Sequence, residues 1–238
     1  MVLVSPRNPL NIGAVARAMA NFGFHELAVV APYRPHWEEA EQAAVGADKV
    51  LEHAQETPTL AEAVAACTLV LGTGTLTYRR PEQPVVELPA LGPLVAEELA
   101  QGGRIAVVFG PEKRGLTRED LSYCHRLVVI PTDDNQPSMN LGQAVAVCLY
   151  EIAARGATIH VSQSDSEAAT SPADSGSLDR MAILIEETMC QAGYSPRSMQ
   201  AANRRDLRLM LRRIKLNSKD ARRALGLFRR VLARLSRR

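Results

Sequence analysis

Short, continuous apolar runs rich in β-branched residues recur through the first part of this 238-residue chain. They occupy residues 1–4, 27–31, 68–73, 104–110 and 126–131. Apolar residues that follow one another without alternation are typical of strands buried on both faces. Segments with helical spacing are found at 12–22, 38–53, 60–66, 91–101, 117–124 and 141–155. This alternation predicts an α/β fold, with a parallel sheet covered by helices on both faces.

The composition changes after the last of these helices. Residues 160–177 contain six serines and few apolar residues, which predicts a flexible linker over 159–177. Three amphipathic helices are predicted within 178–238, because apolar residues recur there at helical spacing and arginines fill the opposite faces. Ser218 is the expected N-cap of the last helix. The sequence therefore predicts a domain over 1–158 and a small, basic helical extension.

The formal net charge of +2 hides a strong asymmetry along the chain. Residues 1–196 contain 13 basic and 24 acidic residues, whereas residues 197–238 contain 15 basic and 2 acidic residues. A basic segment of this kind indicates a polyanionic partner, and nucleic acid is favoured. The alternative is a basic face that docks on the acidic part of its own chain or of a second subunit.

Other features of the sequence exclude or disfavour several classes of protein. No stretch approaches the ~18 consecutive apolar residues of a membrane span. The four cysteines are scattered without a CxxC pair, and the five histidines lack metal-ligand spacing, so no metal site is predicted. Reduced thiols and the short apolar run at the N-terminus favour a cytoplasmic protein.

The glycine-rich loops match no nucleotide-binding fingerprint. Gly72 and Gly74 follow a predicted strand, but the third glycine of a dinucleotide-binding motif is replaced by Thr77. Four loops instead follow the ends of the first, third, fourth and fifth predicted strands. Ligands of open α/β sheets bind beyond the carboxyl ends of strands, so these loops are the best candidates for a site.

Three of these loops resemble the motifs of the SpoU-type RNA ribose 2′-O-methyltransferases of the SPOUT superfamily. The segments are Asn11-Ile12-Gly13 with Arg17, Phe109-Gly110 with Glu112 and Gly115-Leu116, and Ile130-Pro131 with Ser138, Asn140-Leu141 and Ala144. The resemblance covers about residues 1–155. Residues 185–194 and the basic helices further resemble the TrmJ type, which methylates tRNA in the anticodon loop.

The resemblance implies more than local structure cues predict. It implies that the C-terminal part of the sheet domain is threaded into a trefoil knot, that S-adenosylmethionine is the methyl donor, and that a homodimer shares each active site. The expected substrate is tRNA, with rRNA as the alternative. A non-catalytic RNA-binding protein on the same scaffold is a rival from another class, and a DNA-binding helical tail on a metabolite sensor is a third.

Five residues receive catalytic roles from the resemblance. Arg17 contacts the target ribose and its phosphate; because a guanidinium is a poor base, we favour a clamp that stabilises developing negative charge over simple proton abstraction. Asn11 is either a helix N-cap or a group that orients Arg17 or the substrate. Glu112 fixes the catalytic loop or pairs with Arg17. Ser138 and Asn140 line the reaction centre, and one of them is also expected to cap the following helix.

The resemblance also assigns the binding residues. S-adenosylmethionine is expected to contact Thr73, Gly74, Thr75, Gly110, Ile130, Pro137, Ser138 and Met139. RNA phosphates are expected to contact Arg204, Arg205, Arg208, Arg212, Arg222 and Arg223. Only one aromatic residue, Phe228, lies among the arginines of the C-terminal helices, and it belongs to the apolar stripe of its helix. Contacts to the backbone of a folded RNA are therefore favoured over base stacking.

Overall fold

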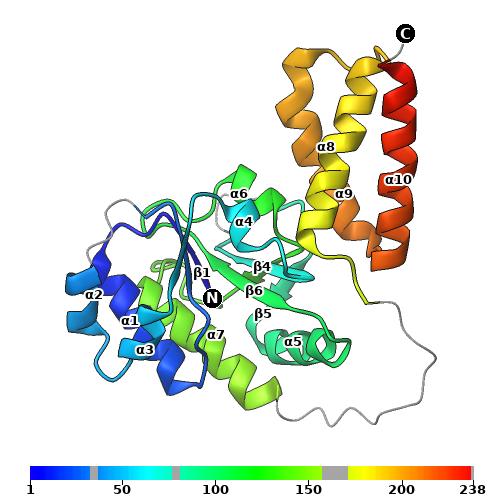
Figure 1. Ribbon diagram of the computed structural model, residues 1–238. Coiled ribbons are helices and arrows are strands. Elements are labelled where there is room, and N and C mark those ends of the chain that lie inside the picture. Colours follow the sequence, from blue (N-terminus) through cyan, green and yellow to red (C-terminus); the bar gives the residue numbers. More distant parts are fainter. Residues whose placement is uncertain (33–36, 77–80, 157–170, 237–238) are drawn as a thin grey trace.

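A computed structural model of the chain describes residues 1–32, 37–76, 81–156 and 171–236 (Figure 1). Within these residues one parallel sheet has the strand order β3-β2-β1-β6-β4-β7-β5. The strands are β1 (Val2–Val4), β2 (Ala28–Val30), β3 (Gln55–Thr57), β4 (Leu69–Thr73), β5 (Val85–Glu87), β6 (Ile105–Phe109) and β7 (Arg126–Val129). The predicted parallel sheet is therefore confirmed.

Helices cover both faces of the sheet, which explains the continuous apolar runs. One face packs against α1 (Pro9–Asn21), α2 (Trp37–Ala43), α3 (Asp48–Glu52), α5 (Leu91–Ala100) and α7 (Leu141–Gly156). The other face packs against α4 (Leu60–Ala63) and α6 (Arg118–Ser122). In β4, Leu71 belongs to the first core and Val70 to the second, so neighbouring residues point to opposite apolar layers.

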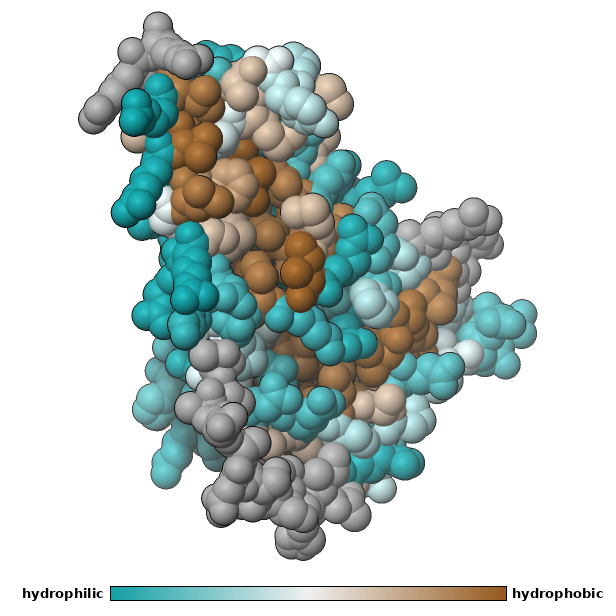
Figure 2. Space-filling view, turned by 90° about the vertical axis from the view of Figure 1, so that its right-hand side faces the viewer, coloured by the Kyte–Doolittle hydropathy of each residue, from teal (hydrophilic) through white to brown (hydrophobic). Residues whose placement is uncertain are grey.

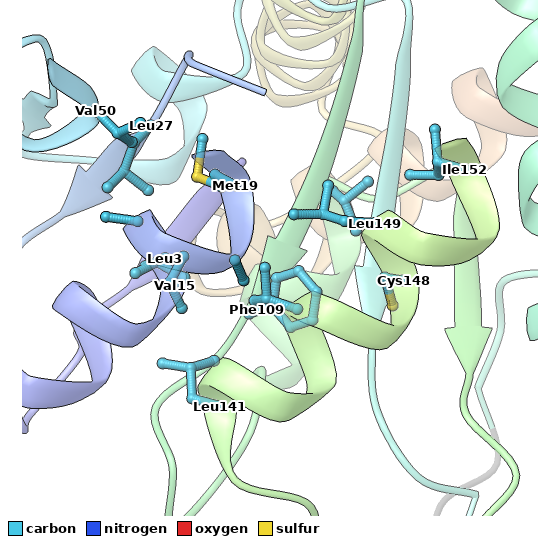
Figure 3. Packing of buried hydrophobic residues seen from close by; sticks show 14 of the residues in the cluster. Leu3, Val15, Met19, Leu27, Val50, Phe109, Leu141, Cys148, Leu149 and Ile152 are labelled. Atoms are coloured by element: carbon cyan, nitrogen blue, oxygen red, sulfur yellow. The ribbon is translucent and has the colours of Figure 1, made fainter. Parts of the chain in front are cut away.

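The larger core joins α1 and α7 to the middle of the sheet (Figure 3). Val15 and Met19 of α1 lie close to Leu3, while Leu149 of α7 lies close to Phe109. All five side chains are at most 3% exposed. Both helices are thus held firmly against strands whose carboxyl ends carry the candidate loops.

Two short strands and one helix break were not predicted. β3 and β5 lie at the two edges of the sheet, and β3 has the polar sequence Gln55–Thr57, so neither carries the signal of a buried strand. The helix predicted over 38–53 is two helices, α2 and α3. Gly46 lies between them with φ +74°, a left-handed conformation that ends a helix.

The C-terminal part contains α8 (Ser175–Gln191), α9 (Gln200–Ile214) and α10 (Ser218–Leu235), with short 3-10 turns at Arg197–Met199 and, earlier in the chain, Leu88–Ala90. α8 packs against both α9 and α10. The N-cap of α10 is Asn217 rather than Ser218, because the Asn217 side chain accepts a hydrogen bond from the amide of Asp220. Figure 2 shows apolar surface gathered over the part of the molecule that these helices form. Leu227 of α10 is 60% exposed.

The last residues of the predicted linker, 171–177, are folded. The linker residues up to 170 lie outside the described residues, but Ala173 is buried and Pro172 forms a β-bridge with Asn217. Asp174 caps α8 by accepting a hydrogen bond from the amide of Ser177, so the helix begins three residues before the predicted position 178. Serines near a helix start serve in capping turns as readily as in linkers, which is why composition misplaced this boundary.

Candidate functional site

A cavity of about 290 Å³ lies at the carboxyl ends of β4, β6 and β7. Three loops that are far apart in the sequence form its walls, together with the start of α7. All eight residues predicted to bind the cofactor line it: Thr73, Gly74, Thr75, Gly110, Ile130, Pro137, Ser138 and Met139. Glu112 lines it as well. The structure thus brings these residues together, and their roles stay predictions.

The first wall is fixed to the two neighbouring strands. Thr73 donates a hydrogen bond from Oγ1 to the carbonyl of Val108 at 3.0 Å, and the amide of Gly74 donates to the carbonyl of Val128 at 3.2 Å. A Cβ atom added at Gly74 would meet only Leu127 Cδ1, at 3.5 Å. Glycine therefore leaves space at this position that a larger side chain would fill.

The second wall is a tight turn after β6. A Cβ atom at Gly110 would lie 2.3 Å from the backbone of Gly115 and Leu116, so the turn closes only around glycine. Gly115 itself has φ +62°, which also favours glycine. Leu116 then enters the core, and Thr117 begins α6 with a reciprocal capping box to Asp120.

The third wall is the polar loop that separates β7 from α7. The amide of Asn135 donates to Asp133 Oδ1 at 2.8 Å, and Thr132 Oγ1 donates to the carbonyl of Pro137 at 3.3 Å. These bonds fold the loop back so that Ser138 and Met139 reach the cavity. The loop is polar because its polar groups bond to one another and its far side is exposed.

A chain of side-chain hydrogen bonds joins these loops to α1. Asn11 donates from Nδ2 to Glu112 Oε1 at 2.7 Å and accepts at Oδ1 from Asn140 Nδ2 at 3.0 Å. Asn140 in turn accepts at Oδ1 from the amides of Gly142 and Gln143 in the first turn of α7. Asn140 is thus the residue that caps α7, as expected of one member of the pair Ser138 and Asn140. Asn11 is not the N-cap of α1, because Asn8 accepts from the amide of Leu10 instead.

Glu112 serves as an anchor for the backbone of the loop before α1. Its carboxylate accepts hydrogen bonds from the amides of Arg7 and Asn8, both at 3.3 Å, besides the bond from Asn11. Partial burial alone would raise the pKa of Glu112, but the bonds from Asn11 and the amides outweigh it and hold the pKa below its ordinary value. A carboxylate used in this way is unsuited to act as a general base at neutral pH. The sequence pattern did not reveal the part played by the amides of Arg7 and Asn8.

Arg17 is exposed and lies almost two turns along α1 from Asn11. It is not among the described residues that line the cavity, and no ion pair to Glu112 is formed within them. Pro111, Lys113, Arg114 and Thr132 also line the cavity, although no motif singles them out. Thr132 lies in a loop whose shape the sequence does not predict.

The six arginines predicted to contact RNA fall into two groups. Arg204, Arg208 and Arg212 bond to carboxylates of other helices, namely Glu186, Glu119 and Asp179. The Arg212 side chain is only 1% exposed and is bonded within the protein, so the structure does not present it to a phosphate. Arg222 and Arg223 lie exposed on α10, and Arg205 forms only a 3.7 Å pair with the adjacent Asp206.

Two further properties concern the described part of the chain. It contains no group of three or more histidine, cysteine, aspartate or glutamate residues arranged to hold a metal ion. None of its helices combines the length and apolar character required to span a membrane.

Comparisons with known proteins point in one direction. The model of the SpoU rRNA Methylase family matches residues 1–150. The tRNA (cytidine/uridine/adenosine-2′-O-)-methyltransferase TrmJ of Pseudomonas aeruginosa is 40% identical over 153 residues, which are 64% of this chain and 59% of that protein. This match therefore spans less than two thirds of the relative.

Two other proteins match along nearly the whole chain. The tRNA (cytidine/uridine-2′-O-)-methyltransferase TrmJ of Pectobacterium atrosepticum is 31% identical over 98% of this chain and 94% of its own length. The crystal structure of TrmJ from Z. mobilis ZM4 superposes with a TM-score of 0.82 at 32% identity, covering 97% of each chain. The likeness thus includes the C-terminal helices.

Proposed function

This chain belongs to the SpoU rRNA Methylase family, and from that premise we propose that it transfers the methyl group of S-adenosylmethionine to a ribose 2′-hydroxyl of tRNA, in the anticodon loop. The observation that carries the proposal is the convergence of three distant loops on one cavity, joined by the chain Glu112–Asn11–Asn140. The tRNA-modifying relative that aligns over 98% of the chain favours tRNA over rRNA.

The cavity fits S-adenosylmethionine in size and chemistry. Its volume of about 290 Å³ is close to the lower end of the ~300–1,000 Å³ range of small-molecule sites, which suits a ligand held in a bent form. The apolar side chains of Ile130 and Leu141 suit an adenine ring, and the hydroxyls of Thr73 and Ser138 suit the polar groups of the ligand. When bound, the sulfonium supplies an electrophilic methyl group for in-line displacement.

The residues of the chain then have to align the ribose and stabilise charge. The bond from Asn11 and the cap on α7 hold Asn140 in one orientation beside the cavity, so it can bind the sugar without reorganising. Arg17 is proposed to clamp the phosphate next to the target ribose and to stabilise the negative charge that develops on the 2′-oxygen as its proton passes to that phosphate or to water. Because Arg17 lies outside the cavity of its own chain, we propose that a homodimer supplies it from the second copy.

The remaining features follow the same family premise. We propose that the loop between β7 and α7 is threaded as a trefoil knot, and that the protein works in the cytoplasm. The sheet domain, residues 1–158, would carry the chemistry, and the helical extension, whose first helix begins at Ser175, would bind RNA. The strong basic balance of residues 197–238 supports that division.

The decisive experiment is incubation of the full chain with labelled S-adenosylmethionine and total RNA, followed by mass spectrometry of the methylated nucleotides. We expect label in the tRNA fraction, on a 2′-O-methylated nucleotide of the anticodon loop. Label confined to rRNA would support the rRNA alternative. A wild-type chain that binds S-adenosylmethionine but labels no RNA would contradict the proposed activity.

A further inference from the structure

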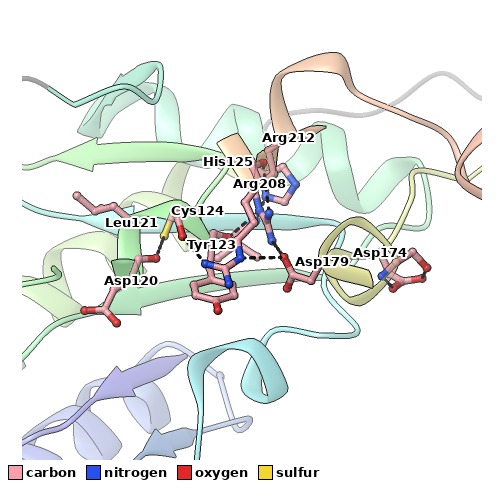
Figure 4. A network of polar contacts seen from close by, with 12 residues as sticks. Asp120, Leu121, Tyr123, Cys124, His125, Asp174, Asp179, Arg208 and Arg212 are labelled. Carbon is pink, nitrogen blue, oxygen red and sulfur yellow. Dashed lines mark hydrogen bonds and ion pairs between the residues drawn. The ribbon is translucent and has the colours of Figure 1, made fainter. Parts of the chain in front are cut away.

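The C-terminal helices are attached to the sheet domain through a buried arginine of α9 (Figure 4). Arg212 donates from Nη2 to Asp179 of α8 at 2.9 Å and from Nε to the carbonyl of Tyr123 at 3.1 Å. Tyr123 is the residue that ends α6. Because the guanidinium is buried and bonded to both elements, it fixes the position of α6 relative to α8 and α9.

A second arginine of α9 binds α6 from the side. Arg208 donates from Nη1 to Glu119 Oε1 and, at 3.1 Å, to Ser122 Oγ. Its guanidinium carbon lies 4.2 Å from the centre of the Tyr123 ring, which adds a cation–π contact. Arg208 is 12% exposed at its side chain, so both arginines lie within the contact between the two parts of the chain.

The start of α8 provides another attachment, next to β4. The amide of Ser175 donates to the carbonyl of Cys67 at 2.8 Å, and the amide of Gly176 donates to the carbonyl of Ala65 at 2.9 Å. Cys67 lies two residues before β4, whose last residue, Thr73, lines the cavity. The C-terminal helices therefore hold both α6 and the start of β4, the two elements that lead into the cavity.

α6 is continuous with the turn that forms the second wall of the cavity. Leu116 and Leu121 pack in the same buried cluster, so a shift of α6 moves the end of the turn. The backbone of Gly115 lies so close to Gly110 that no Cβ atom fits between them. A displacement at α6 is thus passed to Gly110 through atoms that are already closely packed.

We propose that Arg208 and Arg212 are positioning residues, which hold α6 and thereby keep the turn from Gly110 to Leu116 in the shape that binds the cofactor. No residue of α8, α9 or α10 lines the cavity within the described residues, so the effect passes through α6. The identity of the bound cofactor rests on the proposed function, but the effect on the turn does not. RNA held by the C-terminal helices would then influence cofactor affinity through the same contact.

Hydrogen exchange of the turn, measured on the full chain without any ligand, tests the inference. The reporters are the amides of Arg114 and Gly115, which both donate to the carbonyl of Pro111. In Arg208→Gln we expect these amides to exchange on the order of tenfold faster. Glu119→Gln removes the negative charge from the α6 side of the ion pair and should give the same change, and the double variant should add little to either.

A matched control separates position from charge. Arg213→Gln removes one exposed charge from the next turn of α9 and should leave the exchange of the turn unchanged. Binding of S-adenosylmethionine, measured by calorimetry, should weaken about three- to tenfold in Arg208→Gln and Glu119→Gln but not in Arg213→Gln. Unchanged exchange in folded Arg208→Gln and Glu119→Gln would overturn the inference. If wild type binds no S-adenosylmethionine while the exchange responds as expected, the proposed function fails and the positioning role stands.

Discussion

Helices α9 and α10 have the same kind of sequence, an apolar stripe with arginines opposite, yet their arginines differ in environment. In α9, Arg204, Arg208 and Arg212 each bond to a carboxylate of another helix. In α10, Arg222 bonds to the carbonyl of Ser218 and Arg223 pairs with Asp220, both within the same helix. The difference lies in the neighbours, because α9 faces α6 and α8 while the arginine face of α10 is exposed.

This difference shows that the number of arginines in a helix does not tell how many of them are available to a phosphate. An arginine that meets a carboxylate from another element is part of the fold, and its charge is already compensated. An arginine whose bonds stay within its own helix can release them to a phosphate at little cost. Arg17 on α1 belongs to the second kind, since it is exposed and forms no ion pair within the described residues.

The largest effect is expected for the stability of the protein when the buried arginine of α9 is removed. Arg212→Ala leaves Asp179 buried without its closest partner and should lower the free energy of unfolding by about 3–5 kcal/mol. Arg222→Ala on α10 should change it by less than ~0.5 kcal/mol. Urea denaturation of both variants, followed by circular dichroism, measures the contrast; equal effects would show that the two helices do not differ as described.

Arg17→Ala is expected to affect turnover rather than stability. Removal of one group that stabilises transition-state charge costs about 10²–10³ in kcat. Because Arg17 does not line the cavity of its own chain, the affinity for S-adenosylmethionine should stay close to that of wild type. Single-turnover methylation and calorimetry on the same preparation separate the two quantities, and wild-type turnover in the variant would contradict the proposed clamp.

The buried arginine of α9 also acts on a histidine of the sheet domain. Burial, and after it the charges of Arg212 and Arg126, lower the pKa of His125 to about 3, and its Nδ1 accepts from the amide of Val70 at 3.0 Å. Between that value and the unfolded value of about 6.5, the unfolded chain binds a proton that the folded chain does not. Stability should therefore fall as the pH drops below 6.5, by up to about 1.4 kcal/mol per pH unit, or roughly 2 kcal/mol at pH 5.

His125→Asn provides the control, because Asn Oδ1 can accept the same amide hydrogen bond but does not titrate. Its stability should depend less steeply on pH between 5 and 6.5 than that of wild type. Urea midpoints measured across this range decide the point, and parallel profiles for the two proteins would exclude His125 as the cause.

The exposed arginines of α10 should matter for RNA affinity. Replacement of Arg222, Arg223, Arg229 and Arg230 by glutamine should weaken tRNA binding on the order of tenfold at physiological salt. It should also reduce the slope of log K against log salt by up to ~0.7–0.9 for each phosphate that the protein no longer neutralises. The same four positions changed to lysine keep the charge and should retain most of the affinity. Filter binding over a salt series measures both, and an unchanged slope in the glutamine variant would place the RNA elsewhere.

The sheet was predictable because burial on both faces leaves a signal in each strand. The runs that became β1, β2, β4, β6 and β7 were found from sequence, whereas β3 and β5 at the edges were not, because partner strands rather than their own residues define them. The break at Gly46 was also missed. A single glycine inside a helical pattern is tolerated often enough that only its positive φ identifies the turn.

For the candidate site, the position of the loops was predictable, but several contacts between its residues were not. The loops that converge on the cavity follow strand ends, so their position could be expected from the fold. The individual residues, such as Gly110 and Ser138, were named only through the family resemblance. The role of Glu112 as an anchor depends on the amides of Arg7 and Asn8, which lie over a hundred residues away in the chain. The pairing of Arg212 with Asp179 is likewise a property of helix packing, which periodicity does not encode.

The smallest effect concerns the residue that separates α9 from α10. Lys215 ends α9 with φ 53° and ψ 53°, a left-handed conformation that costs an ordinary residue about 1 kcal/mol and glycine almost nothing. Lys215→Gly should raise the free energy of unfolding by ~0.5–1 kcal/mol, since relief of this strain exceeds the added entropy of the unfolded chain. Lys219→Gly removes the same charge from the first turn of α10, where the backbone is helical, and should lower stability by a similar amount. Thermal unfolding of the two variants should therefore show a gain of stability for Lys215→Gly and a loss for Lys219→Gly. A loss of stability in both would mean that the Lys215 side chain contributes more to stability than its backbone strain costs.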